Sequence, residues 1–286
     1  MANLALPVNE IIAAYGAGKT LHEIATVYGC SDWTIKHRLL QAGENLRRTG
    51  PARTYALNES FFEDIQTEQQ AYWLGFLLAD SRVAKTVAGN WICRTDLATV
   101  DTQHLEKLRI AVGTDAPIKS GHDGESVYLD LCSVQLCRAL VSLECGPDKT
   151  SKHGTPAIPD VLQRHFYRGF SDGDGSIYPC PTNHTWRFDA LGSPLFITEM
   201  QHWLVRHAGV GYTKLIIPNN SPVSLSVRYT GGNQVERICR ELYANATVYL
   251  QRKFDSVQRL YSRNKVPGGA AGTRSRHIVE DCTSAI

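Results

Sequence analysis

The sequence of 286 residues predicts a mixed α+β protein with two similar halves, preceded by a small helical module. Three observations support this fold class: a helical motif that occurs twice, a similar run of strands and helices after each copy, and helix-capping signals near the N-terminus. We expect two pseudo-symmetric halves of order αββαββα with antiparallel sheets. The expected boundaries are 1–53 for the helical module and a basic linker, 67–150 for the first half, 151–262 for the second half, and 263–286 for a basic flexible tail.

The N-terminal module is predicted to contain three helices. Val8–Tyr15 has a helical pattern, Thr20 and Glu23 form a capping box, and Ser31 caps a helix that follows a turn at Gly29. The spacing of Ala25, Gly29 and Ile35 resembles helix-turn-helix proteins of the resolvase type, which implies that the third helix enters a DNA major groove. The alternative is a three-helix bundle for protein contact. The candidate DNA contacts are Trp33, Thr34, Lys36, His37 and Arg38, followed by the basic linker residues Arg47, Arg48 and Arg53.

The repeated motif is WLGFLLADS at Trp73–Ser81 and YRGFSDGDG at Tyr167–Gly175. Each copy has small residues four apart on one helix face, which allows two helix backbones to approach closely. These interface residues are Gly75 with Ala79 in the first copy and Gly169 with Gly173 in the second. Each copy then places an aspartate, Asp80 or Asp174, near the end of its helix. Because packing brings these carboxylates together at the negative helix ends, we expect a hard divalent cation such as Mg²⁺ beside them.

The two copies resemble the paired motifs of single-chain LAGLIDADG homing endonucleases, with the eighth position acidic in both. The resemblance implies that Asp80 and Asp174 are the catalytic, metal-binding pair, with Mg²⁺ or Mn²⁺ and with the backbone carbonyls of Ser81 and Gly175 as further ligands. Ser81 departs from the usual glycine at the ninth position, where a glycine would ease the helix exit through a positive φ. Asp172 lies opposite the apolar Leu78 and about 200° around the helix from Asp174, so we do not expect it to be catalytic.

The resemblance also implies that the sheets are saddle-shaped and that the outer face of each sheet contacts double-stranded DNA. Alternation in the later strands predicts core-facing positions at Val127, Leu129, Leu131, Val223, Leu225 and Val227, and groove-facing positions at Tyr128, Asp130, Ser224, Ser226 and Arg228. Further candidate contacts to phosphate or bases are Lys119, Arg187 and Lys214, for which an ordinary solvated strand face is the alternative. The lysine that the family often carries after each motif is absent from Thr99–Asp101 and Leu191–Ser193. Lys149 and Lys253 are instead candidate phosphate contacts, with Arg252 beside Lys253 in a basic segment.

Composition limits these readings without deciding them. The formal charge is +2, the eight cysteines show no zinc-ligand spacing, and no apolar run is long enough to cross a bilayer. These features predict a cytoplasmic protein with reduced thiols. The resemblance implies a Mg²⁺-dependent, site-specific DNA endonuclease, and because its two halves are joined and differ in their groove-facing residues, we expect it to act as a monomer on a long asymmetric site. Two alternatives stay open: a LAGLIDADG-type RNA-splicing maturase, and a helix-turn-helix transcriptional regulator on an inactive nuclease scaffold.

Overall fold

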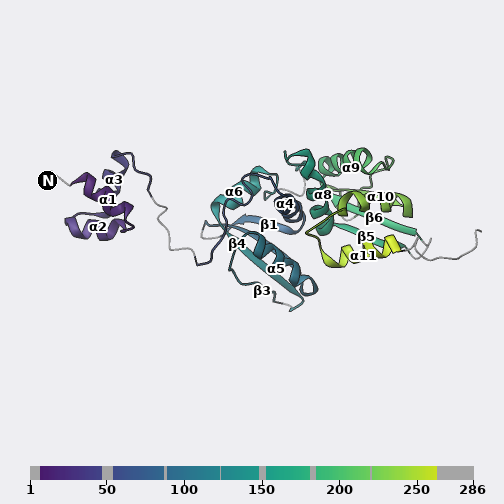
Figure 1. Ribbon diagram of the computed structural model, residues 1–286, viewed down its shortest axis with the longest axis horizontal. Helices are drawn as coiled ribbons and strands as arrows, with labels where there is room; N and C mark the ends of the chain where they lie inside the picture. Colours follow the sequence, from purple (N-terminus) through teal and green to yellow (C-terminus); the bar gives the residue numbers. More distant parts are fainter. Residues whose placement is uncertain are drawn as a thin grey trace, which may run out of the picture. The chain divides into compact units, whose positions relative to one another are not determined.

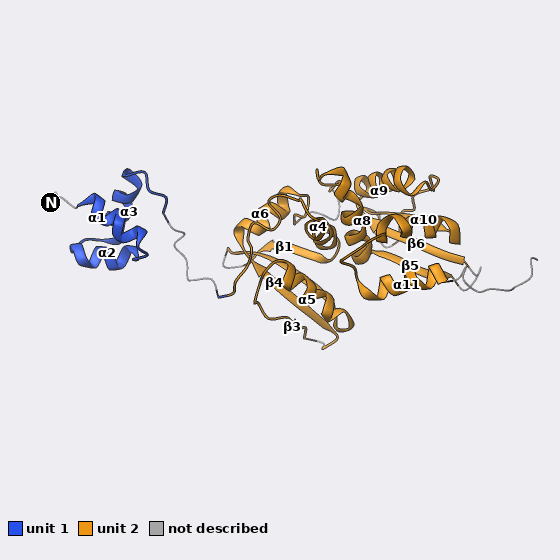
Figure 2. Ribbon diagram, in the orientation of Figure 1, with its two compact units in different colours: residues 1–54 blue, residues 55–286 orange. Residues whose placement is uncertain are grey.

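The computed structural model describes residues 7–46, 54–86, 89–122, 124–147, 153–180, 185–219 and 221–262. The chain divides into two compact units, residues 1–54 and 55–286 (Figure 2). Several predicted sites lie outside the described residues: Arg47, Arg48, Arg53, Lys149 and the tail from 263 to 286. Among the described helices, none is both long and apolar enough to cross a membrane.

The first unit has three helices, α1 (Val8–Gly16), α2 (Leu21–Tyr28) and α3 (Asp32–Gln41). The capping box of Thr20 and Glu23 opens α2, and Ser31 accepts a hydrogen bond from the Thr34 backbone at the start of α3. Gly29 ends α2 with φ of +62°, a left-handed conformation that glycine adopts without steric cost. The helices enclose a small apolar core formed by Ile11, Tyr15, Ile24, Ala25, Ile35 and Leu39.

The first half of the second unit has the predicted order of elements. These are α4 (Glu68–Asp80), β1 (Ser81–Lys85), β2 (Trp91–Ala98), the short 3₁₀ helix η1 (Thr99–Asp101), α5 (Thr102–Ala111), β3 (Lys119–Ser120), β4 (Ser126–Cys132) and α6 (Val134–Ser142). The strands form an antiparallel sheet in the order β1, β2, β4, β3. Val127, Leu129 and Leu131 are buried in the core, which confirms the predicted alternation of β4.

Within the described residues, the second half lacks a counterpart of β3 and has an additional helix after α10. Its elements are α8 (Asp160–Asp174), β5 (Gly175–Cys180), β6 (Thr185–Gly192), α9 (Pro194–Ala208), β7 (Leu225–Thr230), α10 (Gly232–Tyr243) and α11 (Gln251–Ser262). Within the described residues the sheet has the antiparallel order β5, β6, β7. Where a further strand was predicted, Ile216 makes only an isolated bridge to Ser226, so the segment after α9 is mainly irregular.

The last predicted strand also starts later than expected. Val223 was predicted to face the core but is 54% exposed, because Ser221–Ser224 forms a turn and β7 begins at Leu225. Val227 is buried as predicted, and Tyr229 continues the core-facing side of the strand. Within β7 the predicted alternation holds for Val227 and Arg228, whereas Leu225 is only half-buried and Ser226 is buried instead of exposed.

Helices α4 and α8 lie side by side between the two sheets and make the most extensive contact among the elements that the structure describes (Figure 1). A Cβ on Gly75 would lie 2.0 Å from the Phe166 carbonyl oxygen, and a Cβ on Gly169 would lie 1.9 Å from that of Tyr72. No side chain fits at either position. A Cβ on Gly173 would lie 2.3 Å from that of Ala79, so the second pair of small residues also lies at this contact. The helix interface is thus where the motif spacing predicted it.

Candidate active site and nucleic-acid interface

The two motif aspartates end neighbouring helices. Asp80 is the last residue of α4 and Asp174 is the last residue of α8. The Asp80 carboxylate lies against the last turn of α8, since a Cβ on Gly173 would be 3.1 Å from Asp80 Oδ2. Asp174 is exposed and Asp80 is half-buried. The arrangement places one accessible carboxylate from each half at the same end of the helix pair.

The residue after each motif aspartate starts a strand directly. Ser81 has φ of −113° and Gly175 has φ of −92°, so both helices leave through extended backbone. The expectation of a positive φ at this position is wrong, and Ser81 causes no backbone strain here. Gly175 is required for space instead, because a Cβ on it would lie 2.6 Å from the Ser171 carbonyl oxygen. The Ser81 hydroxyl donates a hydrogen bond to the Leu77 carbonyl and so closes the end of α4.

Lys253 of α11 is buried at the end of α8. Its residue is 5% exposed, and Nζ donates hydrogen bonds to four backbone carbonyls, those of Ser171, Asp172, Gly173 and Gly175. The prediction that Lys253 contacts DNA phosphate is therefore wrong, because its ammonium group is used to satisfy the carbonyls that a helix end leaves without partners. The Gly175 carbonyl, predicted as a metal ligand, is held by this ammonium at 2.7 Å.

The charge of Lys253 acts on both motif aspartates. Burial lowers the pKa of Lys253 to about 8, while Asp172 opposes this shift, and so do Asp80 and Asp174 to smaller extents. The attraction to the two motif acids means that a positive charge from the C-terminal helix lies close to both of them. This charge offsets part of the repulsion between two carboxylates at neighbouring negative helix ends.

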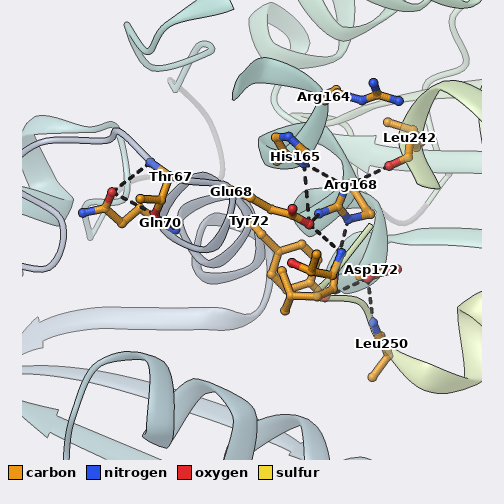
Figure 3. Close-up of polar contacts among 12 residues, drawn as sticks. Thr67, Glu68, Gln70, Tyr72, Arg164, His165, Arg168, Asp172, Leu242 and Leu250 are labelled. Carbon is orange, nitrogen blue, oxygen red and sulfur yellow. Dashed lines mark hydrogen bonds and ion pairs between the residues drawn. The ribbon is translucent and has the colours of Figure 1, made fainter. Parts of the chain in front are cut away.

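Asp172 has a different environment from Asp174, although only two residues separate them. It is fully buried, and its carboxylate accepts hydrogen bonds from the Tyr72 hydroxyl at 2.7 Å, the Tyr243 hydroxyl at 2.6 Å and the Leu250 amide at 2.8 Å (Figure 3). Burial raises the pKa of Asp172, whereas Lys253 and these donors act in the opposite direction. Asp172 therefore joins α8 to α4 and to the segment around α10 and α11.

Arg168, one turn before Asp172, is also fully buried. Its guanidinium donates to Glu68 of α4 at 2.6 Å and to the carbonyls of Leu242 and Val248 at 3.0 Å each (Figure 3). Burial alone would raise the pKa of Glu68, but the Thr247 amide and the charges of Arg168 and His165 lower it below its usual value. The second motif helix thus carries two buried charges, and both are paired across the interface.

The network continues into the first half through His104 of α5. The His104 Nε2 lies 3.0 Å from the Tyr72 hydroxyl, and that hydroxyl donates its proton to Asp172. The His104 Nε2 must therefore be the donor in its contact with Tyr72. Burial lowers the pKa of His104 to about 3, with smaller contributions from Lys107, Arg252 and Lys253. His104 is neutral at pH 7 and is a structural member of the network.

Arg252, the neighbour of Lys253, was predicted to contact DNA. Its Nε lies 2.9 Å from Asp101 Oδ2, and its side chain is 54% exposed. Nearby, Lys107 donates to the Tyr249 carbonyl at 3.2 Å. These contacts attach the C-terminal segment to the first half as well as to α8.

The outer face of the first sheet carries a cluster of charges around Asp130. Arg94 donates to both oxygens of Asp130 at 2.7 and 2.9 Å, and its guanidinium lies 4.2 Å from the centre of the Tyr128 ring. The Nζ of Lys119, a predicted contact, is 3.6 Å from Asp130 and lies over the same ring. The structure therefore brings together three predicted groove-facing residues and adds Arg94.

The outer face of the second sheet has a comparable cluster around Asp189. Arg228 pairs with Asp189, and the Tyr178 hydroxyl donates to the same carboxylate at 3.1 Å. Arg187 donates to the Tyr178 hydroxyl at 3.2 Å. Lys214 is exposed and lies with Arg228 on a shallow cavity of about 440 Å³ that the segment after α9 forms beside β7.

Two serines predicted to face the DNA groove are buried. Ser224 is 5% exposed because it belongs to the turn before β7, where its hydroxyl lies 2.8 Å from that of Ser221. Ser226 is 9% exposed because its backbone and that of Ile216 each donate a hydrogen bond to the other, which places the Ile216 segment beside it. The predicted exposure is therefore wrong for both serines, and at Ser226 the segment that contains Ile216 covers the strand.

In the first unit, the predicted DNA-contacting residues lie along α3. Trp33 is 69% exposed and stacks on His37 with 5.1 Å between ring centres. Lys36 is exposed, whereas Thr34 and Arg38 are half-buried. Trp33, Lys36 and His37 therefore form a continuous exposed patch on this helix.

For two residues of the candidate site, the positions were not predicted from the sequence. Lys253 lies at the helical spacing of the buried residues Ser256, Val257 and Leu260, which would have placed it on the inner face of α11. Arg94 alternates with the buried Cys93 and Thr95 in β2, which would have placed it on the outer face of the sheet. Neither pattern, however, reveals which residues these side chains meet.

Comparison with known proteins gives similarity of fold. No family model and no curated protein matches the chain. Among solved structures, an I-SmaMI mutant has 14% sequence identity and a TM-score of 0.49, covering 70% of this chain and 92% of its own. The I-LtrWI LAGLIDADG homing endonuclease bound to target DNA has 12% identity and a TM-score of 0.47, covering 73% of this chain and 92% of its own. The I-SmaMI LAGLIDADG homing endonuclease bound to cleaved DNA has 15% identity and a TM-score of 0.46, covering 71% and 91%. At these identities and TM-scores the similarity assigns no activity to this chain.

Proposed function

We propose that the protein is a site-specific double-strand DNA endonuclease of the LAGLIDADG homing type that requires a divalent metal ion. The observation that carries this proposal is the pairing of α4 and α8, which brings an accessible aspartate from each half to one end of the helix pair. The solved structures of similar fold named above include two bound to DNA, which is consistent with the same class of substrate. The proposal rests on the motif and the site geometry rather than on that likeness.

In this proposal Asp80 and Asp174 hold the metal ions, with the Ser81 carbonyl as a further oxygen on the first side. The donor set fits a hard cation, because both side chains are carboxylates and Asp174 is open to solvent. Bound Mg²⁺ or Mn²⁺ would activate water and stabilise the charge that develops on the attacked and leaving oxygens of each scissile phosphate. A similar fold has been solved with DNA in the presence of calcium ions, which fits a requirement for a divalent cation.

Lys253 has a supporting role in this proposal. Its ammonium fixes the last turn of α8 through four carbonyls and adds positive charge beside the two motif acids. It therefore orients Asp174 and limits the repulsion between Asp80 and Asp174. Asp172 lies at the interface with its carboxylate fully engaged and takes no part in the chemistry.

The test is cleavage by variants of the motif acids. Asp80→Asn and Asp174→Asn should each abolish double-strand cleavage of a selected duplex in Mg²⁺ while DNA binding persists, because one metal-binding carboxylate is lost in each case. Asp172→Asn should cost stability but change the cleavage rate little. Asp160→Asn, at the exposed start of α8, is the matched control in the same helix. Equal inactivation by Asp172→Asn in a folded, DNA-binding protein would show that the assignment of the acids is wrong.

We further propose that the first unit adds DNA contacts through α3, with Trp33, Lys36 and His37 facing a major groove. Deleting residues 1–53 should leave a folded core with weaker DNA affinity and a shallower slope of log K against log salt, since phosphate contacts determine that slope. The measurement is a salt titration of binding for the full-length and the shortened protein. Equal slopes for the two proteins would contradict this role.

The joined halves also support action as a monomer on a long asymmetric site. The equivalent outer faces differ in their charged residues, so each half should recognise a different half-site. Sedimentation of the protein on its selected duplex should give one chain per site. A preference for a strict palindrome would count against this arrangement.

A further inference from the structure

The two sheets carry equivalent rows of side chains next to the motif aspartates. Ser81 and Gly175 begin the first strand of each half, so the residue that follows each of them occupies the same position in its sheet. Strand pairing then defines the rest of each row. The rows are Arg82, Arg94, Asp130 in the first half and Ser176, Asp189, Arg228 in the second.

Each row contains one ion pair, and the two pairs have opposite polarity. In the first half the arginine, Arg94, is on the central strand β2 and its acid, Asp130, is on β4. In the second half the acid, Asp189, is on the central strand β6 and its arginine, Arg228, is on β7. The two arginines therefore stand on non-equivalent strands, about 4.8 Å apart in the superposed halves.

In both pairs the arginine is the outer partner. The side chain of Arg94 is 42% exposed and that of Asp130 is 12% exposed. The side chain of Arg228 is 41% exposed and that of Asp189 is 17% exposed. Exposed ion pairs contribute little to stability, so the clearer effect of each acid is to fix the direction of its arginine.

The hydrogen bonds leave the outer edge of each guanidinium directed away from its acid. Arg94 uses Nε and one N–H of Nη2 on Asp130, and its plane is supported by the Tyr128 ring. The hydrogen bond from Arg228 to Asp189 also comes from Nε. An arginine has five N–H donors, and its terminal nitrogens can contact O6 and N7 of a guanine together in the major groove.

We infer that Arg94 and Arg228 are specificity-determining residues that each recognise a guanine, with Asp130 and Asp189 as their positioning residues. Because the arginines stand on different strands, the two guanines occupy non-equivalent positions in the two half-sites. This inference rests on the proposed function, since it assumes that the outer sheet faces lie in the major groove of the target. It goes further by naming the bases and the residues that make the target asymmetric.

The experiment is selection from a randomised duplex library by the full-length protein in Ca²⁺, so that binding is scored without cleavage. The wild type should enrich a site with one required guanine in each half. Arg94→Ala should relax the preference at one of them by about 5- to 150-fold, and Arg228→Ala should do so at the other. Arg240→Ala is the matched control, because Arg240 also forms an exposed ion pair, with Glu236 on α10, and should leave both preferences unchanged.

A charge swap separates recognition from a structural role. The double variant Arg94→Asp with Asp130→Arg keeps the pair and the net charge but gives the first half the polarity of the second. The guanine preference of the first half should move to another position or be lost, while the second half keeps its own. Asp130→Asn should weaken the preference at the Arg94 position less than Arg94→Ala does, because the arginine remains but is no longer held.

The outcomes separate the inference from the proposed function. A wild type that enriches no sequence would overturn both. A wild type that enriches a site whose base preferences are unchanged by Arg94→Ala, Arg228→Ala and the charge swap would overturn the inference alone. Loss of preference at bases other than guanine would also overturn it, since the argument depends on the donor pattern of arginine.

Discussion

Helices α4 and α8 fill the same role in the two halves with different chemistry. When the motif aspartates are aligned, Leu74 and Leu78 of α4 correspond to Arg168 and Asp172 of α8, and all four residues are buried. The leucines need only apolar neighbours, whereas the charged pair needs Glu68, Tyr72, and donors or acceptors from the end of α10 and the segment that follows it. An interface between pseudo-symmetric helices can therefore be apolar on one side and ionic on the other, provided that each buried charge has a partner.

The largest effect is expected at the glycines that both helices need for their close contact. Gly169→Ala should prevent stable folding, because the new methyl group would lie 1.9 Å from the Tyr72 carbonyl oxygen and the helices would have to separate. Thermal unfolding and far-UV circular dichroism measure this directly. The control is Gly146→Ala, whose added methyl group would meet nothing closer than 3.8 Å. A normal melting temperature for Gly169→Ala would show that the helix contact is looser than described.

The next largest effect is expected at Arg168, where α8 has a buried charge and α4 has a leucine. Arg168→Leu gives α8 the residue that α4 has at this position, but it should cost about 3 to 5 kcal/mol because Glu68 and two carbonyl groups lose their donor. Urea unfolding of the purified variant measures this loss. Leu74→Met, which conserves volume on the apolar side, should cost less than about 1.5 kcal/mol.

A second substitution sharpens the same comparison. Adding Glu68→Gln to Arg168→Leu should recover part of the lost stability, because it removes the carboxylate that the arginine neutralised. If the two substitutions were additive, the contact between Arg168 and Glu68 would contribute no coupling. The ionic side of the interface would then depend on the backbone carbonyls alone.

The smallest effect concerns pH. Burial gives His104 a pKa of about 3 in the folded protein, against an ordinary value of 6.5, so the unfolded chain binds an extra proton between these pH values. Stability from this residue is complete above pH 6.5 and is lost as the pH falls toward 3, by at most about 1.4 kcal/mol per pH unit. His104→Gln should flatten the dependence of unfolding free energy on pH between 7.5 and 5.5.

Much of the fold could be predicted because its signals are local. Capping residues predicted the helices of the first unit. The four-residue spacing of Gly75 with Ala79 and of Gly169 with Gly173 predicted the interface between the motif helices. The alternation of β4 gave the buried face of the first sheet. These features depend on residues within one or two turns or strands, where a sequence pattern and its structural cause coincide.

The rest depends on partners far away in the chain. Lys253 donates a hydrogen bond to the Asp172 carbonyl although the two residues are 81 positions apart in the sequence, and no local pattern pairs them. The buried Ser224 and the missing strand before β7 reflect how the segment after α9 folds back on the sheet. The pairing of Arg94 with Asp130 likewise needed the register of two strands that are 36 residues apart at this pair. Tertiary context decided these positions.

The partners of Arg168 and Asp172 also set an order of events during synthesis. The chain emerges from the ribosome N-terminus first, so both motif helices are made before Leu242, Leu250 and Lys253 exist. Until those residues have been synthesised, Arg168 and Asp172, which are buried in the folded protein, and the carbonyls at the end of α8 lack some of their final partners. We expect the end of α8, and Asp174 with it, to become fixed only when α11 has been completed. Under the proposed function, DNA cleavage would therefore require α11 to be complete.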